Sequence, residues 1–157
     1  MHEEHWALLR ETFVLAEQAL KAGDAPYGAL LAVGGTVLLH ARNTVSTQHD
    51  ITAHAEMNLI REAWQTLSPE TLSQATLYAS AEPCSMCAGS IYWSGISKVV
   101  FGCGVELNAK ITAQDIVVKA SEVLLRGGRH IELIGPLLED EAALAIRRSC
   151  GVTSSDK

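Results

Sequence analysis

Short apolar runs that alternate with helical segments are the feature of this sequence that most constrains its fold. Two of these runs, "YGALLAV" and "TVLLHA", are joined by Gly34-Gly35, and this arrangement predicts a β-hairpin. Three more apolar runs, "ATLYAS", "KVVFGC" and "HIELIG", each follow a segment with helical features, at about 53–66, 84–93 and 121–128. A hairpin followed by alternating helices and strands predicts a mixed sheet covered by helices, which is a three-layer α/β/α domain.

The remaining parts of the chain fit the same single domain. We predict a first helix over residues 3–22 and a last helix over residues 137–149. Residues 104–119 have no clear period and predict a long loop, with or without helical turns. A chain of 157 residues with 48% apolar and 19% charged residues has the profile of one globular domain. We therefore expect a single domain over 1–157 that ends in a short polar tail from about residue 152.

Charge and hydropathy limit the classes of partner. The formal net charge is −6 and the longest basic run is Arg147-Arg148, which disfavours a polynucleotide partner because such surfaces cluster lysine and arginine. No apolar run approaches the ~20 residues that a membrane span needs. The first residues, "MHEEHWALLRETF", begin with acidic side chains and resemble neither a signal nor a transit peptide. We expect a cytoplasmic protein without a membrane partner.

Two of the four cysteines have the spacing of a metal site. Cys84 and Cys87 form a C-x-x-C pair at a predicted helix start after Pro83, where free N–H groups favour the thiolate form. His54 begins another predicted helix. One imidazole and two thiolates are a ligand set suited to Zn²⁺, and three protein ligands leave the fourth position for water, as in catalytic sites.

Glu56 follows His54 by two residues and is the predicted proton carrier. At this spacing its carboxylate can reach a zinc-bound water without binding the metal. Zinc lowers the pKa of such a water to roughly 7. A carboxylate beside it can take the proton and pass it to a ring nitrogen and to a departing amine. The sequence thus predicts His54, Cys84 and Cys87 as metal ligands and Glu56 as the catalytic residue.

Two readings from other protein classes stay open at this point. Cys103 could complete a closed structural zinc site, which would make the chain a non-catalytic zinc protein and leave Glu56 without a role. Cys84 and Cys87 could instead serve thiol–disulfide exchange, which leaves His54 and Glu56 unexplained. A metal assay combined with thiol alkylation separates the three readings, because a catalytic zinc predicts one tightly bound ion and thiols that react only after chelation.

Together the two segments match the H-x-E…P-C-x-x-C signature of zinc-dependent deaminases. "TAHAEMNLI", "LYASAEPCSMCAGSIYW" and "KVVFG" resemble the cytidine deaminase-like superfamily, in the branch that holds guanine deaminases, fungal-type cytosine deaminases and tRNA adenosine deaminases. The looser similarity runs from residue 25 to residue 102. The resemblance implies a central five-stranded sheet, one Zn²⁺ per chain, and a homodimer or higher homo-oligomer.

The resemblance also implies substrate contacts. Asn43 corresponds to an asparagine that hydrogen-bonds the base, and a simple turn residue is the alternative for this position. The backbone N–H of Ala55 and the carbonyl of Glu82 correspond to groups near a ring oxygen and near the leaving ammonia. Trp93 corresponds to a tryptophan that packs on the purine in guanine deaminases, although it also fits a core position beside Tyr92.

The last third of the chain departs from all three kinds of relative. It lacks the Gly-Ala-rich stretch of the tRNA enzymes, and no Phe, Tyr or Trp follows Phe101 to build an aromatic lid. The resemblance therefore implies hydrolytic deamination of a free nucleobase or related aminated heterocycle, as in purine salvage. Guanine comes first because of Trp93 and the overall motif match, then cytosine or a nucleoside. A tRNA adenosine-to-inosine deaminase is the alternative.

Overall fold

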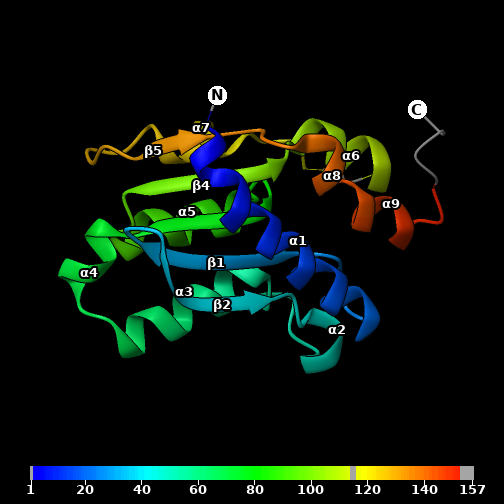
Figure 1. The fold of residues 1–157 in the computed structure, drawn as a ribbon, viewed down its shortest axis with the longest axis horizontal. Helices are drawn as coiled ribbons and strands as arrows, with labels where there is room; N and C mark the ends of the chain where they lie inside the picture. The colour runs from blue at the N-terminus through cyan, green and yellow to red at the C-terminus, as the bar shows by residue number, and fades with distance from the viewer. Residues whose placement is uncertain (1, 114–115, 153–157) are drawn as a thin grey trace.

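A computed structural model describes residues 2–113 and 116–152. Its centre is a mixed sheet of five strands in the order β2-β1-β3-β4-β5 (Figure 1). β1 is antiparallel to both of its neighbours, whereas β3, β4 and β5 run parallel to one another. The strands are β1 Gly28–Val33, β2 Thr36–Arg42, β3 Thr76–Ala81, β4 Lys98–Cys103 and β5 Glu132–Ile134. The predicted mixed five-stranded sheet is confirmed.

Helices cover both faces of this sheet and make the three predicted layers. The long helix α1 crosses one face against β1 and β3, next to α8 and α9, and α3, α5 and α7 pack together on the other face (Figure 1). The helices are η1 Glu3–His5, α1 Trp6–Lys21, α2 Val45–Gln48, α3 Ala55–Thr66, α4 Pro69–Gln74, α5 Ser85–Ser94, α6 Val105–Thr112, α7 Ala120–Leu124, α8 Glu139–Ala142 and α9 Leu144–Ser149.

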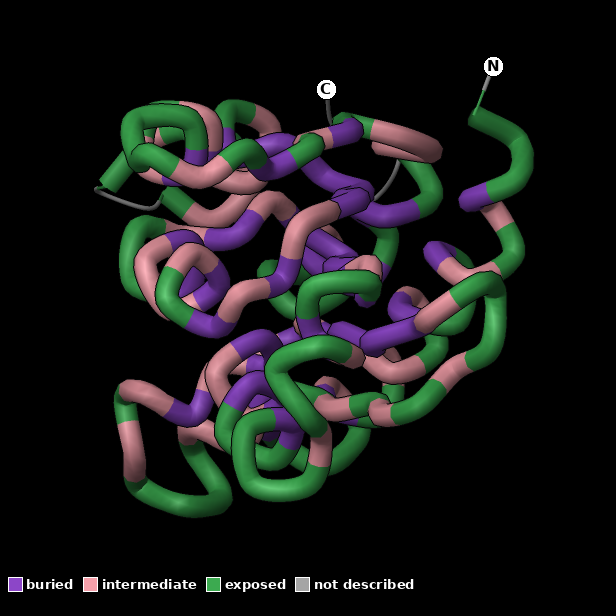
Figure 2. Tube along the Cα trace, turned by 90° about the vertical axis from the view of Figure 1, so that its left-hand side faces the viewer, coloured by how far each residue is buried: buried purple, intermediate pink, exposed green. Residues whose placement is uncertain are grey.

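Alternate residues of the strands fill two separate cores. In β1, Ala29 and Leu31 face the α3–α5 layer, while Leu30 faces α1, and all three are completely buried. Buried segments accordingly run through the interior of the molecule, and exposed ones form its outer turns (Figure 2). The helix α1 approaches very closely at Gly28, where an added Cβ would lie 2.5 Å from the Cβ of Leu15. Only glycine permits this contact.

The structure differs from the sequence predictions mainly in the last third of the chain. The segment 104–119 was expected to be a long loop with helical turns at most, but it contains α6, a helix of eight residues in which only Val105 is buried and which therefore shows little apolar periodicity. The last helix, expected over 137–149, is divided into α8 and α9 at Ala143. The short helices α2 and α4 were not predicted. Most of the polar tail, residues 153–157, lies outside the described residues.

Within the described part of the chain, no helix has the length and apolar character needed to cross a membrane.

Candidate active site

The predicted metal ligands meet where β3 and β4 end. These two strands are parallel, so their carboxyl ends lie together, and Ala81 pairs with Cys103 there. After β3 the chain passes through Glu82 and Pro83 to Cys84, which is the N-cap residue of α5. His54 is the N-cap residue of α3. The positive ends of two helices therefore point toward one place, which favours negatively charged thiolates there.

The distances between the donor atoms fit a tetrahedral zinc ion. His54 Nδ1 lies 3.6 Å from the Sγ of Cys84 and 3.6 Å from the Sγ of Cys87. A Zn–N bond of about 2.05 Å and a Zn–S bond of about 2.3 Å at the tetrahedral angle separate N and S by about 3.6 Å. The three donor atoms all lie within 4.8 Å of one another. The predicted ligand set thus has both the chemistry and the spacing that zinc requires.

The protonation of the two thiols reflects their closeness. Hydrogen bonds from the Cys87 thiol and then from His54 lower the pKa of Cys84 to about 4. The neighbouring Cys84 and burial raise the pKa of Cys87. One negative charge is therefore stabilised at this point by the protein alone, and a divalent cation is the natural counterion for a second thiolate.

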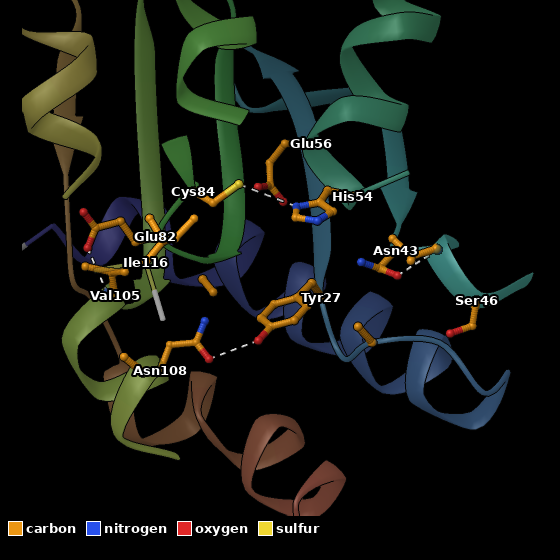
Figure 3. Close-up of a pocket in the computed structure, with 14 residues that line it drawn as sticks. Tyr27, Asn43, Ser46, His54, Glu56, Glu82, Cys84, Val105, Asn108 and Ile116 are labelled. Atoms are coloured by element: carbon orange, nitrogen blue, oxygen red, sulfur yellow. Dashed lines mark hydrogen bonds between the residues drawn. The ribbon is translucent and has the colours of Figure 1, made fainter. Parts of the chain in front are cut away.

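Glu56 lies beside the ligands in a buried position. Its side chain is 7% exposed, and burial raises its pKa to about 6, against a smaller opposing effect of a hydrogen bond from Cys87. A carboxyl group with a pKa near neutrality can both accept and release a proton under physiological conditions. The buried carboxyl group of Glu56 lies next to the ligands His54 and Cys84 (Figure 3).

Cys103 does not join this group. It lies at the end of β4, completely buried, and its Sγ contacts the carbonyl oxygen of Gly104 at 3.6 Å. Burial is the main cause that raises its pKa to about 12. Among the described residues, the cluster around His54 consists of Cys84 and Cys87 and omits Cys103. The closed structural zinc site, which needed Cys103 as its fourth ligand, therefore lacks that ligand.

A cavity of about 270 Å³ opens next to the ligands (Figure 3). Its polar lining residues are Tyr27, Asn43, Ser46, His54, Glu56, Glu82, Cys84 and Asn108. Its apolar lining residues are Ala25, Val45, Ala81, Val105, Ala109 and Ile116. No lysine or arginine is among the described residues that line it. Its size is at the lower end of the range for small-molecule sites, roughly 300–1,000 Å³.

Most of the predicted substrate contacts lie at this cavity. Asn43, only 2% exposed, accepts a hydrogen bond from the N–H of Val45 through its Oδ1 at 3.0 Å. Glu82 lines the cavity. Ala55 is the first residue of α3, between the lining residues His54 and Glu56, so its N–H has no acceptor within the helix. These three residues and the metal ligands are brought together.

Trp93 is not brought to the cavity. Its side chain is 80% exposed on α5 and lies edge-on against Tyr92, with ring centroids 5.2 Å apart. Helical geometry explains its position, because Trp93 stands on the outer surface of α5 whereas Cys87 and Ile91 face the protein. It also does not fill the core, which was the other expectation for this residue.

The sequence analysis missed the apolar lining residues and three of the polar ones, namely Tyr27, Ser46 and Asn108. Tyr27 directly precedes β1, and Asn108 lies on α6, in the segment that was expected to be a loop. The hydroxyl of Tyr27 donates a hydrogen bond to Oδ1 of Asn108 at 3.0 Å across 81 positions of sequence. A helix assignment for 105–112 would have been needed to place Asn108, and the weak periodicity there gave no such signal.

Comparisons with known proteins agree with this geometry. Residues 2–103 match the family model described as the cytidine and deoxycytidylate deaminase zinc-binding region. A probable cytosine deaminase of Schizosaccharomyces pombe is 33% identical over 150 residues, which is 92% of this chain and 91% of that protein. A tRNA-specific adenosine deaminase of Bacillus subtilis is 42% identical over 94 residues, 60% of this chain and 58% of that protein.

The fold is also that of a solved deaminase. A guanine deaminase from Nitrosomonas europaea superposes with a TM-score of 0.78 at 22% identity, over 91% of this chain and 82% of that one. The matched family region contains His54, Glu56, Cys84 and Cys87. This chain therefore belongs to the zinc-dependent deaminase family defined by the cytidine and deoxycytidylate deaminase zinc-binding region.

Proposed function

We propose that this protein hydrolyses the exocyclic amino group of a free nucleobase, a nucleoside or a closely related aminated heterocycle, and releases ammonia. The observation that carries the proposal is the cavity itself. Its lining includes the zinc ligands His54 and Cys84, which cluster with the third ligand Cys87. It also includes the buried Glu56, and it includes no described lysine or arginine.

The electrostatics of the cavity favour a neutral substrate. Glu56 and Glu82 both line it, and a phosphate group would meet these carboxyl groups without a cationic partner. Sites that bind phosphate usually supply arginine, lysine or a helix N-terminus. The N-termini of α3 and α5 already face the metal ligands. At the starts of α2 and α6, the N–H groups of Val45 and Val105 already donate hydrogen bonds to Asn43 and Glu82. A free base or nucleoside therefore fits this cavity better than a nucleotide does.

Guanine and cytosine are the first two substrates to test. Guanine was favoured because of Trp93 and the overall motif match, and the exposed position of Trp93 removes the first of these two reasons. Cytosine gains support from the S. pombe relative, described as a probable cytosine deaminase, because the similarity extends over 92% of this chain.

In the proposed reaction, the zinc ligands, Glu56 and Asn43 have separate roles. His54, Cys84 and Cys87 would hold zinc, which supplies Lewis-acid activation of a water molecule when bound. Glu56 takes a proton from the attacking water and delivers protons to the ring nitrogen and the departing amine. The C–N bond to the amino group breaks, a C–O bond replaces it, and ammonia leaves. Asn43 donates a hydrogen bond that orients the ring.

A panel assay tests this function directly. Zinc-loaded protein is incubated with guanine, cytosine, adenine, their nucleosides and nucleoside monophosphates, and ammonia release is measured. We expect turnover of at least one base or nucleoside, and a lower kcat/KM for its monophosphate. Equal or faster turnover of the monophosphate would contradict the neutral-substrate proposal.

A tRNA substrate is the second candidate, because the B. subtilis tRNA-specific adenosine deaminase is 42% identical over the matched region. The acidic net charge of −6 argues against it. Binding of tRNA with an affinity that falls steeply with salt, together with inosine formation, would favour this candidate. Absence of tRNA binding at low salt would exclude it.

We also propose that the protein forms a homodimer through the outer face of α5. Met86 and Trp93 are seven residues apart, so they lie on one face of the helix, and they are 36% and 80% exposed. Gly89 lies between them with open space around it, which permits close approach of a second helix. Sedimentation of wild type and Trp93→Glu tests this proposal, and a monomeric wild type would contradict it.

The thiol chemistry supports a cytoplasmic location. All four cysteines are free, and two of them must stay reduced to bind zinc.

A further inference from the structure

The amide group of Asn108 is held in one orientation at the wall of the cavity. Its Oδ1 accepts the hydrogen bond from the Tyr27 hydroxyl at 3.0 Å. An asparagine amide carries its acceptor on oxygen and two donors on nitrogen. Because Tyr27 occupies the oxygen, the nitrogen is left to face the cavity, and Figure 3 shows it pointing away from Tyr27.

Tyr27 is well suited to fix this orientation. Burial is the main cause that raises its pKa to about 12, so the phenol keeps its proton over the whole range of assay pH. The residue precedes β1 and packs against the main core, which limits its movement. Asn108 therefore has a stable donor on its oxygen. If the amide turned, it would exchange this bond for one in which its own N–H donates to the phenol oxygen.

Asn43 presents a second anchored amide from another wall. Its oxygen accepts the N–H of Val45, and its nitrogen also points into the cavity (Figure 3). A ligand in this cavity thus meets N–H donors from two sides. A ligand without a matching acceptor leaves a donor unpaired in a partly dry site, which typically lowers affinity about tenfold to hundredfold.

We propose that Asn108, oriented by Tyr27, is a specificity-determining residue of this site. It donates a hydrogen bond to a ring nitrogen or carbonyl oxygen of the substrate, on an edge other than the one that carries the departing amino group. The substrate class is therefore an aminated heterocycle with two acceptor-bearing edges, one for Asn43 and one for Asn108. This inference rests on the proposed deaminase function.

An experiment of the double-mutant-cycle type, which combines a change of residue 108 with a change of substrate, tests the proposal. Wild type and Asn108→Leu are compared on the preferred substrate and on analogues in which one ring nitrogen is replaced by C–H or one carbonyl oxygen is removed. We expect Asn108→Leu to lower kcat/KM for the preferred substrate about 10- to 100-fold. For the one analogue that lacks the contacted acceptor, the same substitution should change kcat/KM by no more than about twofold.

A merely structural role predicts a different pattern. In that case Asn108→Leu lowers kcat/KM for the preferred substrate and for all analogues by the same factor, and this result would overturn the proposal. An unchanged kcat/KM for every compound would overturn it as well.

Asn108→Asp keeps the shape of the side chain and an oxygen for Tyr27, so it covers the case in which Asn108→Leu does not fold. It replaces the donor by a carboxylate, and we expect a loss on the preferred substrate at least as large as that of Asn108→Leu. Lys110→Gln is the matched control, because it lies on the same helix, is exposed, and changes the charge by the same amount. Its kcat/KM should equal that of wild type.

The activity of wild type on the panel distinguishes a failure of the proposed function from a failure of the inference about Asn108. If zinc-loaded wild type releases ammonia from no compound of the panel, the proposed function fails and this inference falls with it. If wild type is active and the cycle shows no coupling between Asn108 and any acceptor, the inference alone fails. Coupling to one acceptor supports both and identifies the edge that Asn108 contacts.

Discussion

The zinc-ligand region, residues 54–87, and the closing segment, residues 104–120, build the same cavity by different means. The ligands stand at the N-termini of α3 and α5, which pack their apolar faces on the sheet. The closing segment contains the short helix α6, whose only buried residue is Val105. Leu107 and Ile111 pack α6 on the small core beside α9, and its position depends in addition on polar bonds to other parts of the chain. We infer that the first region fixes the reaction and the second selects the substrate.

Glu82 links the two regions. Its two carboxylate oxygens accept the N–H of Val105 at 3.0 Å and the N–H of Ala120 at 2.7 Å, near the two ends of the closing segment. Glu82 also lies two residues before Cys84, the ligand at the start of α5. One side chain thus connects the segment that we assign to substrate selection with the loop that holds the metal.

The largest effect is expected from Glu56→Gln. The amide has nearly the same shape but cannot carry a proton, so kcat should fall about 10²- to 10⁴-fold on every substrate. Zinc content should stay at that of wild type, because Glu56 is not a ligand. The measurements are ammonia release and metal analysis. Glu62→Gln, an exposed position on the same helix, is the matched control. Full activity of Glu56→Gln would disprove the assignment of the proton carrier.

Alkylation of the thiols checks whether the zinc-ligand region is a metal site or a redox site. With zinc bound, Cys84 and Cys87 should resist iodoacetamide and become reactive after chelation. Cys150 is exposed and should react at the same rate in both states, which makes it an internal control. Cys103 is completely buried and should stay protected in the folded protein. Rapid labelling of Cys84 in the zinc-loaded protein would favour the thiol–disulfide reading. Mass spectrometry of labelled peptides measures each site.

The sequence predicted these two regions unequally, and the reason is physical. Ligand residues at helix starts carry a local pattern, because the turn geometry, the helix N-terminus and the metal all act on a few neighbouring positions. His54, Glu56, Cys84 and Cys87 could therefore be singled out from short motifs, and the sheet could be read from apolar runs. Which residues approach them from distant segments depends on tertiary packing that no local pattern records.

Asn108 and Trp93 illustrate the limit. Asn108 reaches the cavity because α6 is tethered to Glu82 and Tyr27, contacts that span long sequence distances. Trp93 was expected at the substrate or in the core, since a large aromatic side chain is seldom left in water. The structure places it on the outer face of α5. Side-chain size indicates that burial is favourable without indicating what covers the residue.

The hydrogen bonds of Glu82 to the closing segment can be removed without changing a metal ligand. Glu82→Ala removes the acceptors of two backbone N–H groups, so we expect a loss of stability of about 2–3 kcal/mol and a raised KM, with zinc content unchanged. Thermal unfolding and kinetics on the preferred substrate measure both. Glu106→Gln, on the same segment, is the control, because its pair with Lys119 is exposed and such pairs contribute about 0–1 kcal/mol. Loss of zinc in Glu82→Ala would contradict a separation of the two regions.

The smallest effect concerns Asp24, which fixes the wall that carries Asn43. Asp24 is 5% exposed, and its two oxygens accept the N–H of Thr47 at 2.8 Å and the hydroxyl of Thr47 at 2.6 Å. The bond from the Thr47 hydroxyl has the largest effect on the pKa of Asp24, and both bonds lower it. We expect Asp24→Asn to lower the free energy of unfolding by about 1–2 kcal/mol at pH 7, with little change in kcat.

The lowered pKa of Asp24 determines how the stability difference between wild type and Asp24→Asn should change with pH. A carboxyl whose pKa is lower in the folded state stabilises the protein fully above its unfolded pKa of about 3.9, and this contribution is lost as the pH falls through the folded value. Urea unfolding should therefore show a constant difference between wild type and Asp24→Asn from pH 7 down to about pH 5. The difference should shrink below about pH 4. Thr47→Val should remove much of the same stabilising energy. The loss of stability in the double variant should therefore be smaller than the sum of the two single losses. A difference that persists unchanged into acid would mean that Asp24 acts through packing, and that this wall, like the zinc-ligand region, is held by the core.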